Sequence, residues 1–439
     1  MKRGDEPMST CEKMIQSLKD GEHDKILKKL YAMDGTRESL DRARKRAVRA
    51  VEEFQKQFVP GPDADVALFS GPGRTEIGGN HTDHQHGRVL CGSVDLDMLA
   101  CAAPNGLDMI RICSEGYPVV NVSLNQLFPR EEERNTSASL VRGVAAKMVE
   151  IGYTLFGFDA YVTSDVLSGS GLSSSAAYEV LVANLLNYYC GGSLDDIQIA
   201  KVSQYAENIY FGKPCGLMDQ MGASVGGAVA IDFADPTAPV VNKVEYDFSK
   251  CGHALCIVDT GSCHADLTDD YAEITREMSA VAAYFEKQYL RDVPEEEFYA
   301  AIPSLRICCG DRAVLRAMHY YEDDRRAVEE AEALAAGDFE RFLELVNASG
   351  ISSATNLQNI WSVDSPKQQA VTLALALGKK LLGGTGAIRV HGGGFAGTIQ
   401  AFVPNEKLAA FKSGMETVLG PRRCHVLHIR PMGGCLVIP

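Results

Sequence analysis

Apolar side chains recur at spacings of three and four residues in the first part of the chain, among many charged side chains. They are Met14, Ile15, Leu18, Ile26, Leu27, Leu30 and Tyr31, followed by Val48, Val51, Phe54 and Phe58. This period is typical of amphipathic helices, so residues 10–58 are predicted to form surface helices. After the Gly/Pro-rich stretch at 61–73, short apolar runs at 88–103 and 107–113 predict the start of a β-rich layer.

The middle of the chain alternates between predicted strands and helices. A strand candidate at 156–165 leads into a Gly/Ser loop, and a helix rich in Ala, Leu and Val is expected over 173–189. A strand, a Gly loop and a helix in this order are the organisation of a phosphate-binding element. The run 193–211 predicts another helix, with Ser193 as its N-cap and acidic residues in its first turn.

A chain of 439 residues is longer than the usual size of a domain with a single hydrophobic core, so two lobes are expected. The polar tract at 235–239 is the best place for the boundary between them. We therefore expect a helical N-terminal extension over 1–40, an N-terminal lobe over 41–235 and a C-terminal lobe over 236–439. The other predicted elements are strands at 226–233 and 254–259, helices at 266–291, 311–336 and 366–381, a strand, Gly-rich turn and strand at 386–403, and a closing strand near 424–438.

Charge and cysteine content narrow the classes of function. Lys and Arg number 43 against 58 Asp and Glu, and the formal charge of −15 argues against a nucleic-acid-binding role. The thirteen cysteines include no CxxC pair and no zinc-site spacing, which predicts free thiols in a reducing compartment. The cytoplasm is therefore the expected location of the protein. The N-terminus shows no apolar signal segment, and no run of about 18 apolar residues occurs, so neither secretion nor membrane insertion is expected.

The first candidate functional segment is SGPGRTEIGGNHTDHQHGRVL at residues 70–90. Its glycines would let backbone approach a ligand closely, and among them stand the side chains Arg74, His81, Asp83, His84 and His86. Two alternatives are a polar surface turn with incidental histidines and a metal site made by His81, Asp83 and His84. Neighbouring residues at this spacing rarely point to one centre, which weighs against the metal.

The second segment is LSGSGLSSSAA at residues 167–177, a Gly/Ser loop that opens a helix. Its backbone N–H groups and the positive end of the helix dipole would hold phosphate oxygens. The loop lacks the Lys of a Walker loop. A flexible linker is the alternative, and the Ala-rich helix that follows at once argues against it.

Two more segments carry candidate chemistry. In KPCGLMDQ at 213–220, Asp219 follows a Pro/Gly break in a nearly uncharged neighbourhood, although a lone Asp there could simply cap a helix. In VHGGGFAG at 390–397, turn chemistry explains one or two of the glycines but not four.

Together these segments resemble the GHMP kinases, and within them the galactokinases. Residues 72–83 (PGRTEIGGNHTD) are similar to the galactokinase signature, 169–176 to the family's phosphate loop, 214–220 to its catalytic Asp segment and 391–397 to its Gly-rich third motif. Four motifs in order are far more specific than one. The resemblance, which covers roughly residues 40 to 439, implies an α+β fold with an N-terminal mixed lobe, a C-terminal ferredoxin-like lobe and an active site between them.

The resemblance also implies roles for individual residues. Asp219 would act on the C1 hydroxyl of a sugar, with Arg74 beside it to keep that Asp ionised and to stabilise the transferring phosphoryl group of ATP. Ser175 and Glu207 would be Mg²⁺ ligands, since both offer hard oxygen donors. The phosphate loop would comprise Gly169, Ser170, Gly171, Leu172, Ser173, Ser174, Ser175 and Ala176. The sugar-binding positions would be Asn80, His81, Asp83, Gly216 and Tyr271.

The chain departs from the galactokinase pattern at three positions. It has Asn80 where the family has Glu, His84 where it has Tyr, and Ala396 where it has Gly. Because an amide would not repel a carboxylate at C6, galacturonate or another C6-variant sugar is an alternative to galactose. A catalytically silent sugar sensor and a mevalonate-type kinase are further alternatives. The protein is expected to be a monomer or a homodimer that binds a sugar and ATP, without nucleic-acid or membrane partners.

Overall fold

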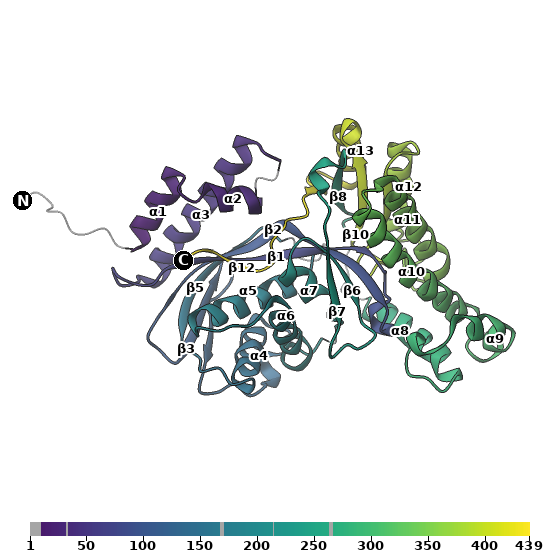
Figure 1. The fold of residues 1–439 in the computed structure, drawn as a ribbon, viewed down its shortest axis with the longest axis horizontal. Coiled ribbons are helices and arrows are strands. Elements are labelled where there is room, and N and C mark those ends of the chain that lie inside the picture. The colour runs from purple at the N-terminus through teal and green to yellow at the C-terminus, as the bar shows by residue number, and fades with distance from the viewer. Residues whose placement is uncertain (1–9, 32–33, 167–170, 214, 263–266) are drawn as a thin grey trace, which may run out of the picture.

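The computed structural model describes residues 10–31, 34–166, 171–213, 215–262 and 267–439. Its strands form two sheets (Figure 1). The first sheet has eight strands, with neighbours in the order β12, β1, β2, β5, β3, β4, while β6 pairs with β2 and β7 with β6. Their bounds are β1 Ala67–Gly78, β2 Arg88–Pro104, β3 Met109–Ser114, β4 Val120–Ser123, β5 Phe158–Ser164, β6 Ala228–Asp232, β7 Val240–Val244 and β12 Cys435–Ile438.

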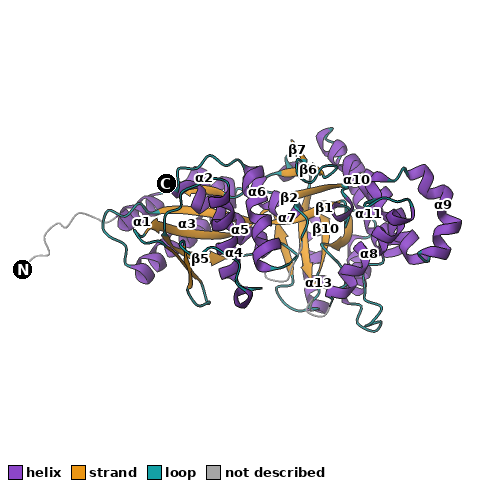
Figure 2. Ribbon diagram, turned by 90° about the horizontal axis from the view of Figure 1, so that it is seen from below, coloured by secondary structure: helices purple, strands orange, loops and turns teal. Residues whose placement is uncertain are grey.

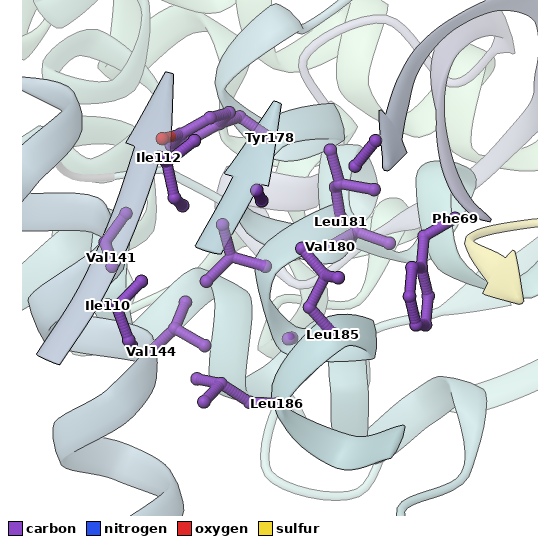
Figure 3. Packing of buried hydrophobic residues seen from close by; sticks show 14 of the residues in the cluster. Phe69, Ile110, Ile112, Val141, Val144, Tyr178, Val180, Leu181, Leu185 and Leu186 are labelled. Atoms are coloured by element: carbon purple, nitrogen blue, oxygen red, sulfur yellow. The ribbon is translucent and has the colours of Figure 1, made fainter. Parts of the chain in front are cut away.

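Both faces of the first sheet are covered by helices, which explains why all twelve residues of β1 are buried. On one face, Phe69 packs with α4 (Ser137–Glu150) and α5 (Ser174–Tyr189), as Figure 3 shows for Val141, Val144, Val180 and Leu181. On the other face, Leu68 packs with the N-terminal helices. The alternation of the strand thus sends successive side chains into two different cores.

The N-terminal helices are α1 (Thr10–Asp20), α2 (Asp24–Tyr31) and α3 (Arg37–Phe58), so the predicted helices over 10–58 are confirmed. Thr36 caps α3, because its side chain accepts a hydrogen bond from the backbone N–H of Ser39. The apolar stripe that the sequence pattern revealed is the face that these helices bury against the sheet.

The helix predicted over 193–211 differs in two details. Its N-cap is Asp195, not Ser193, because Asp195 and Gln198 form a reciprocal capping box. The α-helix α6 (Asp196–Tyr205) then continues as a π-helical turn over Ala206–Phe211. Such turns insert an extra residue and often lie at functional sites, and this one carries Glu207.

The second sheet has four antiparallel strands in the order β11, β8, β10, β9. They are β8 (His253–Asp259), β9 (Ala387–His391), β10 (Thr398–Pro404) and β11 (Cys424–Leu427). Figure 2 shows helices gathered beside these strands, with α9 at the end of the molecule far from α1. The helices are α8 Thr268–Tyr284, α9 Glu295–Cys308, α10 Asp311–Ala335, α11 Phe339–Ser352, α12 Ala370–Leu382 and α13 Leu408–Leu419.

Two predictions for the second half were wrong in extent. The helix expected over 266–291 ends as α8 at Tyr284, and nearby Glu286 has a left-handed φ of 57°. The closing strand expected near 424–438 is two strands in different sheets, since β11 pairs with β8 and β12 pairs with β1. Between them, the backbone N–H of Arg430 donates to the carbonyl of Ser93 at 2.9 Å, and the carbonyl of Arg430 accepts from the N–H of Gly227 at 2.8 Å.

Sheet membership does not coincide with the expected boundary at residue 235. Strands β7 and β12 both follow that residue in the chain, yet they belong to the first sheet. Within the described residues, no helix is long and apolar enough to cross a membrane.

Candidate active site

Asp219 and Arg74 form the centre of the candidate site. Arg74 lies on β1, and Asp219 lies in the first turn of α7 (Met218–Val225). The Nε and Nη2 atoms of Arg74 donate to Asp219 Oδ1 at 2.8 and 2.5 Å. The Arg74 side chain is 6% exposed, whereas that of Asp219 is 24% exposed. The carboxylate is therefore held by a buried cation and still reaches a surface that a substrate can approach.

The environment keeps Asp219 ionised. Burial raises the pKa of the Asp219 carboxyl, but the charge of Arg74 and a hydrogen bond from the Ser173 hydroxyl outweigh it and hold that pKa below its ordinary value. The pKa of Arg74 is raised by Asp219 against the opposing effect of burial. The two side chains thus form an ion pair at neutral pH.

The described end of the predicted phosphate loop, residues 171–173, lies against this ion pair. Arg74 donates through Nη1 to the carbonyl of Gly171, and its backbone N–H donates to the carbonyl of Leu172 at 3.1 Å. Ser173 has a left-handed φ of 53°, and its hydroxyl donates to Asp219 Oδ2. The predicted loop residues Gly169 and Ser170 lie outside the described residues. Sequence reasoning placed Ser173 in the loop but did not predict its direct contact with Asp219.

The helix that follows the loop begins at Ser174, and Ala176 lies buried in its first turn. The N-terminus of α5 therefore lies directly after Ser173. Backbone N–H groups in this first turn lack intrahelical partners by helix geometry, and they carry the positive end of the helix dipole. This arrangement can bind phosphate oxygens beside Asp219.

Ser175 and Glu207, the two residues expected to bind Mg²⁺, lie together. The Ser175 hydroxyl donates to Glu207 Oε1 at 2.9 Å, and Glu207 is 1% exposed. The other carboxylate oxygen, Oε2, accepts from Gln220 Nε2 at 2.7 Å and from the Cys215 thiol at 3.2 Å. A hydroxyl and a carboxylate fit the preference of Mg²⁺ for oxygen donors, completed by phosphates and water.

Sequence reasoning missed two residues behind this pair. Gln220, which is fully buried, also donates through Nε2 to Glu179 Oε2 at 3.1 Å, so its amide bridges two carboxyl groups. Burial, and then the charge of Glu207, raise the pKa of Glu179 well above its ordinary value. The only available signal was the place of Gln220 beside Asp219 in the motif, because Glu179 occupies an ordinary helical position.

Two of the expected sugar-binding residues meet beside α7. A Cβ atom added to Gly216 would lie 2.1 Å from Asp83 Oδ2, so only glycine lets the Asp83 carboxylate lie this close to the backbone. The other oxygen of Asp83 accepts from the backbone N–H of His84 at 3.0 Å. The carboxylate of Asp83 is thereby held in a fixed orientation.

His81 and Tyr271 both contact the Gly-rich turn between β9 and β10. The turn and its two flanking strands were predicted from the sequence, and the structure confirms them. His81 Nε2 lies 2.9 Å from the carbonyl of Gly393, and the Tyr271 hydroxyl donates to the carbonyl of Gly394 at 3.0 Å. Burial lowers the pKa of His81 to about 4, so this imidazole is neutral and its Nε2 carries the donated hydrogen. A Cβ atom on Gly393 would lie 2.2 Å from the Tyr271 ring.

Asn80 does not fit its expected role as a sugar contact. Its side chain is fully buried, and both N–H groups of its amide are used, donating to Glu76 Oε1 at 2.9 Å and to the carbonyl of Gly392 at 2.8 Å. Its Oδ1 accepts from Asn359 Nδ2 at 2.9 Å. The amide therefore joins β1 to the Gly-rich turn. The residue type alone could not indicate this, since its partners are distant in the sequence.

The alternative metal site of His81, Asp83 and His84 gains no support. His81 is engaged with Gly393, and the side chain of His84 is 39% exposed. Across the part of the chain that the structure describes, no group of three or more His, Cys, Asp or Glu residues is arranged to hold a metal ion.

Comparison with known proteins agrees with this geometry. Residues 139–227 match the GHMP kinases N-terminal domain, and residues 52–104 match the galactokinase galactose-binding signature. The fold is similar to that of a Lactococcus lactis galactokinase complexed with galactose, with 24% identity, a TM-score of 0.74, and 88% of this chain and 98% of that chain covered.

Other members of the same fold are less similar. A mevalonate kinase from Methanococcus jannaschii is 15% identical with a TM-score of 0.59, covering 84% of this chain and 99% of that one. A Streptococcus pneumoniae phosphomevalonate kinase in complex with phosphomevalonate and AMPPNP is 15% identical with a TM-score of 0.56, covering 82% and 98%.

The solved structures and the matching N-terminal domain show that the chain has the GHMP kinase fold, which occurs in a class of phosphotransferases. Within this fold, residues 52–104 match the galactokinase galactose-binding signature.

Proposed function

We propose that the protein transfers the γ-phosphoryl group of ATP to the C1 hydroxyl of a sugar, with galactose as its leading substrate. The observation that carries this proposal is the position of Asp219, which contacts both Arg74 and Ser173 of the phosphate loop. A carboxylate next to a phosphate-binding helix N-terminus is the arrangement that phosphoryl transfer to a hydroxyl requires.

In the proposed reaction, the sugar O1 forms a bond to the γ-phosphorus while the bond from that phosphorus to the β,γ-bridging oxygen breaks, and its electron pair leaves with ADP. The proton of O1 passes to Asp219. A carboxylate with a lowered pKa is a weak base, so this proton transfer suits a late stage, when bonding to phosphorus has made O1 acidic. Arg74 keeps the carboxylate charged and offsets developing negative charge nearby.

Mg²⁺ would be held by Ser175 and Glu207, whose oxygens are 2.9 Å apart. The bound metal would neutralise phosphate charge during transfer. The bridge from Gln220 fixes the rotamer of Glu207 and so orients its carboxylate. ATP and Mg²⁺ are thus the proposed cosubstrate and cofactor.

Galactose is favoured because the chain matches the galactose-binding signature and because the fold resembles a galactokinase complexed with galactose. The sugar would contact Asp83, His81 and Tyr271, which the structure orients through hydrogen bonds to backbone groups. Asn80 is removed from this proposed set, since its amide is committed to protein partners.

We also propose a cytoplasmic location, in line with the free cysteines.

Coupled ADP release across a panel of sugars tests the proposal. We expect turnover with galactose, and much less with galacturonate and with mevalonate. Turnover with mevalonate alone would favour the mevalonate-type alternative. Calorimetric binding of galactose without any turnover would instead identify a sugar sensor, which the complete set of Asp219, Arg74, Ser175 and Glu207 argues against.

A further inference from the structure

Lys213 is a charged residue of the site to which no role has been assigned. It follows the π-helical turn and Gly212, and its Nζ lies 3.5 Å from Glu207 Oε1. The same carboxylate oxygen accepts the hydrogen bond from Ser175. The Lys213 side chain is 61% exposed while that of Glu207 is 2% exposed. The ammonium group therefore lies on the solvent side of a buried carboxylate.

The surroundings of Lys213 are acidic. Lys213 lies beside the carboxylate of Glu207, and the negative charges of Glu207 and Asp219 favour the charged ammonium form and raise the pKa of Lys213 against the opposing effect of burial. Its charge also acts on Asp219 and Glu179. Lys213 is thus a cation beside the carboxylate that is proposed to hold the metal.

Lys213 and Arg74 differ in how firmly they are held. Arg74 is buried and donates to both Asp219 and the carbonyl of Gly171, so its position is fixed. The contact of Lys213 with Glu207, at 3.5 Å, is longer than a good hydrogen bond. A lysine ammonium on a flexible four-carbon stem can move by several Å at little cost.

We propose that Lys213 is a mobile phosphate-binding cation of this kinase: it neutralises Glu207 when no metal–nucleotide is bound, and it contacts the γ-phosphoryl group when ATP is bound. The inference rests on the proposed function of Glu207 and the loop. Since Lys213 and a divalent cation then compete for Glu207 Oε1, the metal binds poorly alone and enters together with the nucleotide.

The test compares Lys213→Met with the full-length wild type in binding experiments without sugar. Mn²⁺ affinity in the absence of nucleotide is measured by electron paramagnetic resonance, and the affinities for AMPPNP and ADP with Mg²⁺ by calorimetry. We expect Lys213→Met to bind Mn²⁺ about tenfold more tightly and to lose about tenfold of its preference for AMPPNP over ADP, the scale of one partly exposed charge contact.

Lys201→Met is the matched control, because Lys201 is a lysine of α6 whose Nζ donates to the backbone carbonyl of Thr237 at 2.7 Å. It should change neither quantity, while Lys213→Arg should keep the AMPPNP preference. An unchanged Mn²⁺ affinity or an unchanged AMPPNP to ADP ratio in Lys213→Met would overturn the proposal. Failure of the proposed function shows separately, as a wild-type protein that turns over no sugar.

Discussion

Asp219 combines two properties that a single substitution can separate, its shape and its charge. Asp219→Asn keeps the shape but removes the anion that pairs with Arg74 and that we propose accepts the hydroxyl proton. We expect kcat to fall by at least about a hundredfold, the usual effect of losing an acid/base group, while AMPPNP affinity changes little. Steady-state kinetics and calorimetry measure the two quantities. Near-normal turnover would remove Asp219 from the mechanism.

Ser175 and Glu207 are expected to determine the metal requirement. Ser175→Ala deletes one oxygen donor, and Glu207→Ala deletes the carboxylate that Ser175 and Gln220 orient. Both variants should need a higher Mg²⁺ concentration for half-maximal rate, with Glu207→Ala the more severe because it also removes a charge. Rates are compared over a Mg²⁺ titration at saturating ATP. If the titration curves of both variants overlay that of wild type, the metal is bound elsewhere.

Asn80, which the resemblance placed among the sugar-binding positions, instead contacts protein groups in the structure. In the structure, a carboxylate at this position would face Glu76 Oε1 and the carbonyl of Gly392, and neither is a hydrogen-bond donor in this contact. We therefore expect Asn80→Glu to lower the free energy of unfolding by about 3 kcal/mol. It should also lower kcat/KM for galactose and galacturonate alike.

Chemical denaturation and kinetics with the two sugars test this expectation. Exposed His84, changed to the family's Tyr, is a control that should leave stability nearly unchanged. A stable Asn80→Glu protein with a raised galactose to galacturonate ratio would support the original sugar-contact hypothesis instead.

At the scale of elements, the sequence pattern was sufficient wherever local chemistry determines the outcome. The helix α3 and the long strand β2 could be predicted because periodicity and caps are local signals. The closing strand could not be assigned correctly. The local sequence patterns of β11 and β12 both predict a strand, and the two differ only in the distant strands with which they pair. The π-helical turn at Glu207 also has no clear sequence signal.

The candidate site follows the same division. Asp219, Arg74, Ser175 and Glu207 could be predicted from motifs, and the structure brings each pair within hydrogen-bonding distance. The contacts between motifs could not be predicted, since the bond from Ser173 to Asp219 spans 46 residues. Asn80 lies in a predicted motif, yet its side chain does not have the predicted sugar-binding role. Its Oδ1 accepts a hydrogen bond from Asn359, 279 residues away, which the motif could not indicate.

The segment between β11 and β12 provides a pH-dependent contact with β2. His428 donates through Nδ1 to Asp95 Oδ2 at 2.9 Å, and this bond raises the pKa of His428 above its ordinary value. A raised folded-state pKa stabilises the protein fully below the unfolded-state pKa, and this contribution is lost as the pH rises through the folded-state pKa. Asp95→Asn should therefore destabilise the protein more at about pH 5.5 than at about pH 9.

Urea denaturation of wild type and Asp95→Asn at both pH values measures this difference. His428→Gln gives an independent check, since it removes the titrating group and should show the same loss at low pH. An equal loss of stability at both pH values in Asp95→Asn would mean that the contact does not depend on the charge of His428.

At the scale of the whole molecule, strand β1 joins the two lobes through successive residues. Arg74 pairs with Asp219 of the first lobe, and Glu76 pairs with Arg389 of β9 at 2.5 Å in the second. Thr75, between them, accepts from Gln400 of β10 at 2.8 Å. Arg74, which holds the Asp219 carboxylate, is therefore connected through successive residues of β1 to strands β9 and β10, so a displacement of either lobe would be transmitted to the candidate site.

The N-terminal helices are tied to the same strands by a buried ion cluster around Asp97. Arg46 of α3 donates to Asp97 Oδ1 at 2.5 Å, Tyr31 of α2 donates to Oδ2 at 2.6 Å, and Arg430 lies 3.3 Å from Oδ2. Arg46 also pairs at 3.2 Å with Asp165, which precedes the phosphate loop. The extension is thus part of the folded core and contacts the segment that leads to the loop.

Arg46→Met should weaken both connections. It leaves Asp97 with Arg430, Tyr31 and Ser70 but removes one of two cations from a fully buried carboxylate, so we expect the free energy of unfolding to fall by about 2–3 kcal/mol. Arg49→Met, three residues along α3, is the matched control, because the side chain of Arg49 is 62% exposed and its pair with Glu115 should contribute no more than about 1 kcal/mol. Chemical denaturation of both variants decides the matter. Equal losses would show that α3 is held by its apolar face alone, and a larger loss in Arg46→Met would establish the Asp97 cluster as the attachment of the N-terminal helices to the kinase core.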